Sequence, residues 1–257
     1  MSTTESSLLV DIHGHVMVMT LNRPQVKNAA DFELASAMAA AIDKLESDPN
    51  LRVGIITGAG GNFCTGMDLK GFLKGSRPSI PGRGFCGLTE APPKKVLIAA
   101  IEGYALAGGF EVALACDLLV ASREAKFGLP EVKRGLVASA GGMMRLPQRL
   151  PFHIAMECIL TGDFLGAERA YNFGLLNRLT EPGKALDSAL ELAQTIAGNG
   201  PLSVATSKRV VTESADWSRT EMFDRQRDIV APVFTSADAR EGALAFAEKR
   251  KPVWTGQ

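Results

Sequence analysis

Short, nearly continuous runs of apolar residues, rich in Val and Ile, recur along this chain and constrain its fold more than any other feature. They run into glycine-rich or polar turns, and residues 31–45 after the first run show the apolar spacing of a helix. Strands that are apolar at nearly every position are covered on both faces, as in α/β proteins. The sequence therefore predicts an α/β core with strands at 16–21, 53–57, 96–101 and 118–121.

Strand signals stop near residue 182, and helical spacing replaces them. Pro201 suits the first turn of a helix, and Thr235 or Ser236 suits an N-cap. The 257 residues are enough for one large domain, or for a domain with a small appendage. We expect an α/β core at 8–182 and a helical, oligomerising region at 183–257, with helices at 184–197, 202–213 and 238–249.

The charge balance argues against several classes of partner. Lys+Arg and Asp+Glu both number 28, so a general attraction to nucleic acid or to an anionic membrane is not expected. The N-terminus lacks an apolar signal core, and no apolar run approaches the roughly 20 residues that span a bilayer. We therefore expect a cytoplasmic protein that binds neither nucleic acid nor membrane.

Metal and disulfide signals are weak. The four cysteines are scattered and form no C-x-x-C pair, which argues against a zinc site and gives no sign of a disulfide framework. His13 and His15 are two residues apart on a predicted strand, so they share a face and could chelate a metal. No third ligand is evident, and a surface strand is the simpler interpretation.

The segment IEGYALAGGFEVALACD at 101–117 is the most informative for function. A predicted buried strand ends in a small-residue turn, and a helix begins near Gly108-Gly109. The glycines let a ligand approach the backbone, and free N–H groups at a helix start favour negative charge. Glu111 lies in the first helical turn, so an amide donor and a carboxylate would face one small volume. The alternative is that Glu111 only caps the helix, although a capping box wants Ser or Thr in place of Gly108.

Two other segments carry candidate groups. In FGLPE, Glu131 follows a Gly-x-Pro turn whose proline fixes the backbone direction; a solvated turn residue is the alternative. In FCTGMDL at 63–69, a short predicted strand opens into a turn and then a helix, so the amide of Met67 could be free. An ordinary strand-to-helix turn is the alternative there.

These three segments, in this order and at these separations, resemble the enoyl-CoA hydratase/isomerase (crotonase) family. The likeness extends from about residue 8 to residue 254 and includes NRP at 22–24 and the terminal AFAEKRKP. The separation of 20 residues between Glu111 and Glu131 matches that of the two catalytic glutamates in family hydratases. The resemblance implies the crotonase (ClpP/crotonase-like) fold, an α/β architecture of repeated ββα turns with a C-terminal helical region.

The resemblance also implies residue roles. Two backbone amides of the family bind the thioester oxygen of an acyl-CoA substrate, and the matching residues are Met67 and Gly108. Glu111 and Glu131 match the acid/base pair that adds water to an α,β-unsaturated acyl-CoA. Two nearby carboxyls share a proton and can supply both functions. Because both glutamates are retained, hydratase chemistry is favoured over isomerase chemistry. No metal or other cofactor is implied, because coenzyme A is part of the substrate.

Contacts to coenzyme A follow from the same analogy. Backbone near Val26, Thr65 and Asp68 would approach the adenine and pantetheine. Lys249 and Arg250 could reach the 3′-phosphate, also from a neighbouring subunit, in the homotrimer or hexamer that the resemblance implies. A solvated helix end is the alternative for these two.

Ser139, in GLVASAGG, departs from the family, because its hydratases commonly have Gly at that position. The added hydroxyl could alter substrate preference, whereas a serine hydrolase is not indicated, because VASAG lacks the first Gly of G-x-S-x-G. Segments such as GLTE at 87–90 look similar to carnitinyl-CoA dehydratases, whose activity is the second candidate. A non-catalytic acyl-CoA-binding or RNA-binding member is a third, disfavoured by the glutamate pair and the neutral charge.

The segment at 75–90 is rich in Gly, Pro and Arg and has no periodicity. It is predicted to be a mobile surface loop. Its position after a candidate site segment suggests a lid, and disorder without functional consequence is the alternative.

Overall fold

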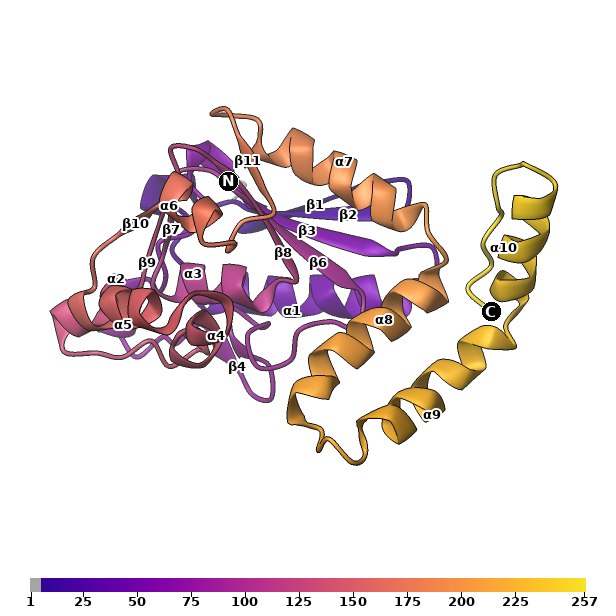
Figure 1. The fold of residues 1–257 in the computed structure, drawn as a ribbon. Helices are drawn as coiled ribbons and strands as arrows, with labels where there is room; N and C mark the ends of the chain where they lie inside the picture. The colour runs from indigo at the N-terminus through magenta and orange to yellow at the C-terminus, as the bar shows by residue number, and fades with distance from the viewer. Residues whose placement is uncertain (1–5) are drawn as a thin grey trace.

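A six-stranded sheet forms the centre of the molecule (Figure 1). The structure is a computed structural model that describes residues 6–257. The strand order is β1-β2-β3-β6-β8-β11, in which β1 and β2 form an antiparallel hairpin and all other neighbours are parallel. The strands are β1 (Leu8–His13), β2 (Val16–Leu21), β3 (Val53–Gly58), β6 (Val96–Ile101), β8 (Leu118–Ser122) and β11 (Arg178–Thr180).

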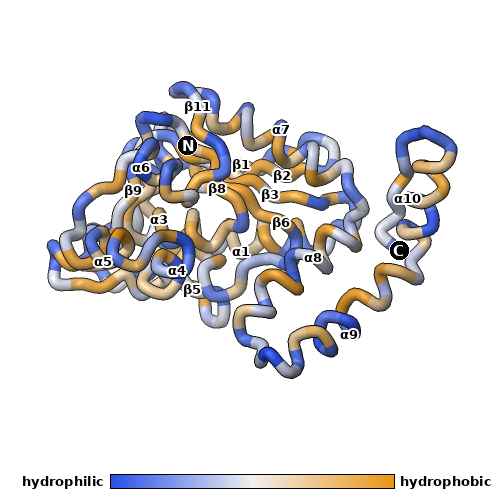
Figure 2. Tube along the Cα trace, in the orientation of Figure 1, coloured by the Kyte–Doolittle hydropathy of each residue, from blue (hydrophilic) through white to orange (hydrophobic). Residues whose placement is uncertain are grey.

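Both faces of the inner strands β2, β3, β6 and β8 are buried, as their continuous apolar sequences predict. Alternate residues of the inner strands belong to two separate core clusters, one on each face. Helix α7 (Ala185–Ala197) covers one face, whereas α1 (Phe32–Ser47) and α3 (Gly108–Ala115) cover the other (Figure 1). The strands accordingly appear as hydrophobic segments between these helices in Figure 2.

A smaller sheet continues from the carboxyl ends of the main strands. Strand β7 (Tyr104–Leu106) follows β6, and β9 (Lys126–Gly128) follows β8; the two pair in parallel, and β10 (Leu165–Gly166) joins β9. The chain thus repeats a strand–strand–helix unit, since α3 begins after β7 and the short helix η3 (Pro130–Arg134) begins after β9. The remaining elements up to β11 are η1 (Pro24–Val26), η2 (Ala59–Gly61), α2 (Leu69–Phe72), β4 (Ser79–Ile80), β5 (Gly84–Phe85), α4 (Gly142–Arg149), α5 (Phe152–Thr161) and α6 (Ala167–Asn172).

The predicted helix starts are confirmed by their caps. The Asp31 carboxylate accepts a hydrogen bond from the amide of Leu34, which starts α1. Pro201 is the first residue of α8 (Pro201–Glu213). Ser236, not Thr235, caps α10 (Ala237–Ala247).

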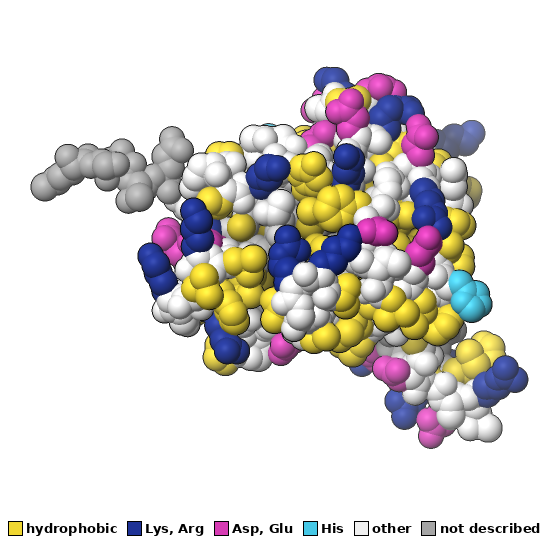
Figure 3. All heavy atoms as spheres, turned by 90° about the vertical axis from the view of Figure 1, so that its left-hand side faces the viewer, with side chains coloured by type: hydrophobic (Ala, Val, Ile, Leu, Met, Phe, Trp, Pro, Cys, Tyr) yellow, Lys and Arg dark blue, Asp and Glu magenta, His cyan; other side chains and the backbone are white. Residues whose placement is uncertain are grey.

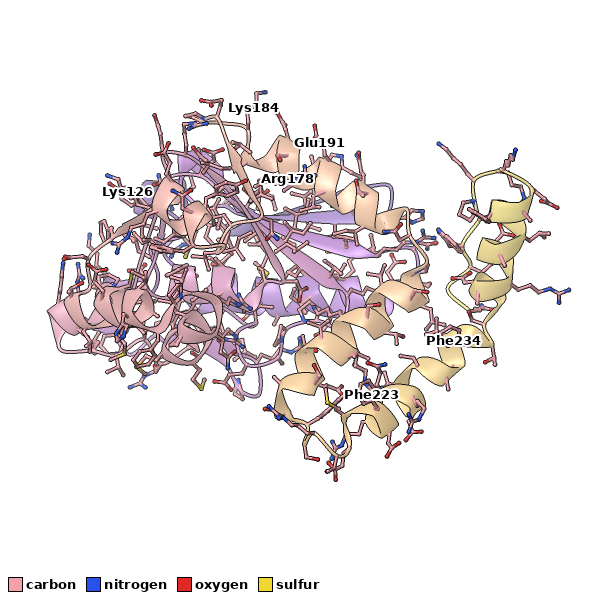
Figure 4. All side chains as sticks on the ribbon, viewed as in Figure 1. Lys126, Arg178, Lys184, Glu191, Phe223 and Phe234 are labelled. Carbon is pink, nitrogen blue, oxygen red and sulfur yellow. The ribbon has the colours of Figure 1, made fainter. Side chains whose placement is uncertain are left out.

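The C-terminal helices extend away from the sheet (Figure 1). After α8 come η4 (Ser214–Asp216) and α9 (Met222–Phe234), and α9 contains no buried residue. Phe223 and Phe234 on α9 are 63% and 80% exposed (Figure 4). The strands end at β11 as predicted, but α7 packs on the sheet rather than with these helices. A division of the chain at residues 182 and 183 stays a prediction.

The last residues return from α10 to the body of the protein. The indole N–H of Trp254 donates to the carbonyl of Gly198, at the end of α7, over 2.7 Å. The buried carboxylate of Asp238, in the first turn of α10, accepts from the amides of Thr255 and Gly256. The arm formed by α9 and α10 is therefore anchored at both ends.

The two histidines do not share a strand, contrary to the prediction. His13 is the last residue of β1, whereas His15 lies in the hairpin turn, where its Nδ1 donates to the carbonyl of Asn50. Residues 6–257 contain no group of three His, Cys, Asp or Glu side chains arranged to hold a metal. Within the same residues no helix is both long and apolar enough to cross a membrane.

Candidate active site

A cavity of about 900 Å³ opens beside the first turn of α3. Its walls come from the turn before α2, from the segment at 75–90, from the start of α3, and from η3 with the residues that follow it. Figure 3 shows the end of the molecule at which α2 and α5 lie, where lysine and arginine side chains stand among apolar patches. The predicted site residues that line the cavity are Val26, Thr65, Met67, Asp68, Gly108, Glu111, Glu131 and Ser139.

Glu111 is buried in the first turn of α3 and points away from the helix cap. Its Oε1 accepts a hydrogen bond of 2.8 Å from the amide of Gly142, the first residue of α4. The N-cap residue of α3 is Ala107, and the Ala107 amide donates to the carbonyl of Gly128 instead. The capping interpretation is therefore wrong, because the carboxyl group of Glu111 accepts from the amide of Gly142 and not from the amide of the N-cap residue.

Glu111 holds its proton unusually tightly. Burial raises its pKa from the ordinary 4.5 to about 7, and the negative charge of Glu131 adds to the effect. The hydrogen bond from Gly142 and the positive charge of Arg145 act in the opposite direction. A carboxyl group with this pKa can both give and take a proton near neutral pH.

Glu131 enters the cavity from η3, directly after Pro130. Its Oε2 is buried and has no hydrogen-bond partner among the described residues. Burial raises the pKa of Glu131, against the charge of Arg134. The interpretation as a solvated turn residue is therefore wrong. A buried carboxyl oxygen without a partner is an unusual group in a folded protein and marks a place for a ligand or water.

Two residues with free backbone amides, Met67 and Gly108, line the same cavity. Met67 forms a parallel β-bridge with Ala30. The hydrogen bonds of this bridge are made by the carbonyl of Gly66 and the amide of Asp68, on either side of Met67, which leaves the Met67 amide pointing the other way. Gly108 is the first residue of α3, so no preceding helical turn offers its amide a carbonyl acceptor. Among residues 6–257 neither amide donates to a backbone carbonyl. The two turns touch, since a Cβ on Gly66 would lie 3.2 Å from the Gly108 nitrogen.

The ring of Phe85 leaves no room for a side chain on Gly108. A Cβ added to Gly108 would lie 2.5 Å from the ring of Phe85, which belongs to β5. Ala107 has a φ of 50° and a ψ of −132°, a strained conformation for a residue with a side chain. The ψ angle of Ala107 sets the direction of the Gly108 amide, and this strained residue lines the cavity.

The segment at 75–90 is a surface loop, as its composition predicts, only in its first part, where residues 75, 77, 79, 81 and 82 are exposed. It contains the hairpin of β4 and β5, and residues 84–89 are buried. Phe85 covers Gly108, and Gly87 packs against the backbone of α1, where a Cβ would lie 2.4 Å from the carbonyl of Ala35. The residues of the segment that line the cavity are Arg77, Pro78, Ser79, Phe85 and Glu90. Whether its tip acts as a lid stays a prediction.

Asp68 is held by groups of the protein itself. Its carboxylate accepts from the amides of Lys70 and Gly71 and so caps α2, and it pairs with Arg23 at 3.2 Å. Although burial opposes it, the hydrogen bonds from Gly71 and Arg23 lower the pKa of Asp68. The predicted strand before it is reduced to one bridge, between Cys64 and Ala105. Asp68 lines the cavity chiefly by shaping this turn.

Ser139, Lys249 and Arg250 occupy different surroundings. Ser139 is exposed in the cavity wall, three residues before α4. Lys249 and Arg250 follow α10 and do not line the cavity of their own chain. Arg250 pairs with Glu241 and Glu248. A phosphate contact of these two residues from a neighbouring subunit stays a prediction.

Sequence reasoning missed several residues that complete the site. The Gly142 amide, the Phe85 ring and the Arg145 guanidinium carry no recognisable motif of their own. In the sequence, Gly141 and Gly142 stand out only as a glycine pair, and no local pattern connects the pair with Glu111. The signal that could have found Gly142 is that a buried acid needs a nearby donor.

Residues 11–257 match the family model described as enoyl-CoA hydratase/isomerase. The chain is 42% identical to the carnitinyl-CoA dehydratase of Proteus mirabilis (strain HI4320), over 98% of the chain and 99% of the relative. It is 40% identical to enoyl-CoA hydratase EchA19 of Mycobacterium tuberculosis, over 98% of each.

Solved structures give the same grouping. The crystal structure of an enoyl-CoA hydratase from Mycobacterium tuberculosis H37Rv matches with a TM-score of 0.97 and 56% identity, over 98% of this chain and 100% of that chain. The carnitinyl-CoA hydratase structure from Mycobacterium avium matches with a TM-score of 0.79 and 39% identity, over 99% and 100%.

Proposed function

The chain belongs to the enoyl-CoA hydratase/isomerase family, and we propose that it is an enoyl-CoA hydratase. It has the crotonase fold, as the resemblance implies. The reaction is the reversible addition of water across the double bond of an α,β-unsaturated acyl-CoA thioester. One observation supports this proposal most directly: the buried carboxyl group of Glu111 and the partly buried one of Glu131, both with raised pKa values, line the same cavity as two unpaired backbone amides.

The amides of Met67 and Gly108 form the oxyanion hole in this proposal. They bind the thioester oxygen, on which negative charge grows as water attacks the β-carbon. Preorganised donors of this kind contribute roughly 3–4 kcal/mol each to transition-state stabilisation. The position of Gly108 at the start of α3 adds the positive end of a helix dipole.

Glu111 and Glu131 supply the proton transfers. One carboxylate takes a proton from the attacking water, and the other, protonated, gives a proton to the α-carbon of the enolate. Because their charges repel, the pair holds one shared proton near neutral pH, and its two titration steps belong to the pair. No metal or redox cofactor enters this scheme, since the thioester itself makes the β-carbon electrophilic.

The rest of the substrate is assigned by analogy with the family. Val26, Thr65 and Asp68 line the cavity and would contact coenzyme A, and Lys249 and Arg250 of a neighbouring subunit would meet its 3′-phosphate. We propose a homotrimer or hexamer of cytoplasmic chains on the same grounds. The exposed phenylalanines of α9 support an assembly, because large apolar side chains are usually covered.

Hydration of crotonobetainyl-CoA is the second candidate. Relatives named carnitinyl-CoA dehydratase support it, as does the cavity wall, which includes the Glu90 carboxylate and the rings of Phe72 and Phe85. A carboxylate with aromatic rings suits a trimethylammonium group. The guanidinium of Arg77 lies 5.7 Å from the centroid of the Phe72 ring and opposes a second cation there.

The test follows the ultraviolet absorbance of the conjugated thioester with a panel of enoyl-CoA substrates, crotonyl-CoA and crotonobetainyl-CoA included. Glu111→Gln and Glu131→Gln should each lower kcat by about 10²–10⁴-fold, as expected for loss of a general acid or base. Glu124→Gln, at an exposed acid outside the cavity, is the matched control. Equal rates in all variants would remove the mechanism. Thioester binding without turnover by the wild type would favour a non-catalytic binder.

A further inference from the structure

Arg145, on α4, connects two walls of the cavity. Its Nη2 donates to the carbonyl of Thr89 over 2.7 Å, and its Nη1 donates to the carbonyl of Ala140 over 3.4 Å. Thr89 ends the buried part of the 75–90 segment, and Ala140 precedes the glycine pair at the start of α4. One partly buried guanidinium therefore bridges two segments, at Thr89 and at Ala140, which lie 56 and 5 residues before Arg145 in the sequence.

The glycine pair depends on this guanidinium. Gly141 has a φ of +107°, and a Cβ on it would lie 2.0 Å from Nη1 of Arg145. The guanidinium thus lies directly against the turn that precedes Gly142. The Gly142 amide in turn donates to Oε1 of Glu111. The Ala140 backbone, whose carbonyl Arg145 also bonds, acts on the same carboxyl group. A movement of Arg145 would therefore change the direction of the backbone donors that hold Glu111.

The other end of the bridge affects the oxyanion side. Thr89 follows closely on Phe85, whose ring covers Gly108. Through the carbonyls of Thr89 and Ala140, Arg145 thereby links the segment that carries Phe85 to the turn that contacts Glu111. Arg145 itself does not line the cavity.

The charged and titratable groups around this bridge are few. Glu131 from η3 and Arg145 from α4 act on Glu111, and Arg134 acts on Glu131. Cys116, after α3, and Arg149, on α4, are the other groups that interact with Arg145. Glu90, next to Thr89, is exposed at the cavity edge. Arg145 is thus the cation that acts on Glu111 in the described part of the chain.

We propose that Arg145 is a positioning residue: its guanidinium fixes the Gly141–Gly142 turn against the carbonyl of Thr89 and so aims the Gly142 amide at Glu111. A catalytic role for this arrangement rests on the proposed function, but the arrangement itself does not. Its fixed charge and its hold on the amide both favour the ionised form of Glu111. Neither effect involves contact between Arg145 and the substrate.

Three variants separate this role from a purely structural one. Arg145→Gln removes the charge and the planar fork, and Arg145→Lys keeps the charge but cannot bond both carbonyls in the same way. Arg149→Gln is the matched control. Arg149 lies one turn further along α4, is partly buried and donates to the carbonyl of Cys116.

The readout is a pH titration of the Glu111 carboxyl carbon by ¹³C NMR, assigned by its loss in Glu111→Gln. In Arg145→Gln the midpoint should rise by about half to one pH unit, as expected when an opposite charge near a partly solvated site is removed. Arg145→Lys should shift in the same direction by less, and Arg149→Gln should keep the wild-type midpoint. Because Arg145→Lys preserves the charge, it carries the test if Arg145→Gln does not fold.

Kinetics add a second readout. With crotonyl-CoA, the pH profile of kcat in Arg145→Gln should move to higher pH, with kcat lower by about tenfold or more because the acid is misplaced. An unchanged Glu111 midpoint in Arg145→Gln, or an equal shift in Arg149→Gln, would overturn the proposal. If the wild type does not turn over any enoyl-CoA, the proposed function fails, whereas the titration still decides the role of Arg145.

Discussion

Replacing Glu111 by Gln should stabilise the protein at high pH relative to the wild type. Glu111 is 3% exposed, and its pKa rises from 4.5 in an unfolded chain to about 7 in the folded protein. Between these two values the folded state binds a proton that the unfolded state does not, so the wild-type free energy of unfolding falls by about 1.4 kcal/mol per pH unit. The total loss is roughly 3 kcal/mol between pH 4.5 and pH 7.

The variant lacks this titration but can keep the hydrogen bond, since an amide oxygen also accepts from the Gly142 amide. Urea denaturation of both proteins at pH 4.5 and pH 8.5, at one protein concentration, measures the effect. The free energy of unfolding of Glu111→Gln minus that of the wild type should be larger at pH 8.5 by roughly 3 kcal/mol. Glu124→Gln, at an exposed acid, should give nearly the same difference at both pH values. A pH-independent difference for Glu111→Gln would refute the reasoning, because it would mean that ionising the buried carboxyl has no energetic penalty.

Two further changes probe the walls of the site. Gly108→Ala places a Cβ 2.5 Å from the Phe85 ring and should displace the Gly108 amide, so that kcat/KM in the enoyl-CoA assay falls by about 10²–10³-fold; wild-type kinetics would exclude this amide as a donor. Arg23→Met leaves Asp31 and Asp68 without the cation that lies 2.9 Å and 3.2 Å from them, and urea denaturation at pH 7 should show a loss of roughly 1–3 kcal/mol. Because pairing lowers the pKa of Asp68, its contribution is present at neutral pH and disappears as the pH falls through that pKa, so the loss should shrink in acid. A loss of stability that is equally large at pH 7 and at acid pH would contradict the role of the Arg23–Asp68 pair.

The sheet and the acids were predictable because their signals are local. A run such as VLIAAI reads as a strand buried on both sides wherever it occurs, and it does form β6. The glycines at a helix start point to Glu111, whereas the turn before Glu131 fits a solvated residue as well, and only the family resemblance selects Glu131. Ordered motifs then connected the two, since a separation along the chain says nothing by itself about proximity in space.

The remainder of the site depends on tertiary packing. Phe85 lies in a segment whose composition is that of a loop, and its burial comes from the fit of that segment against α1 and Gly108. The Gly142 amide is a backbone group with no side chain to identify it, and Arg145 resembles any arginine on an amphipathic helix. The outward course of α9 is equally hidden in the sequence, because its apolar spacing resembles that of a packed helix although none of its residues is buried in the described part of the chain.

The return of the last residues to Gly198 makes the α9–α10 arm a closed span rather than a loose tail. A span pinned at both ends samples far fewer arrangements than one held at a single end. Phe223 and Phe234 are therefore held in a nearly fixed arrangement before a partner binds. Association through them loses less conformational entropy than it would from a flexible tail. Removing the Trp254 indole would release one end of the span and leave the cavity in place, because no residue of α9 or α10 lines it.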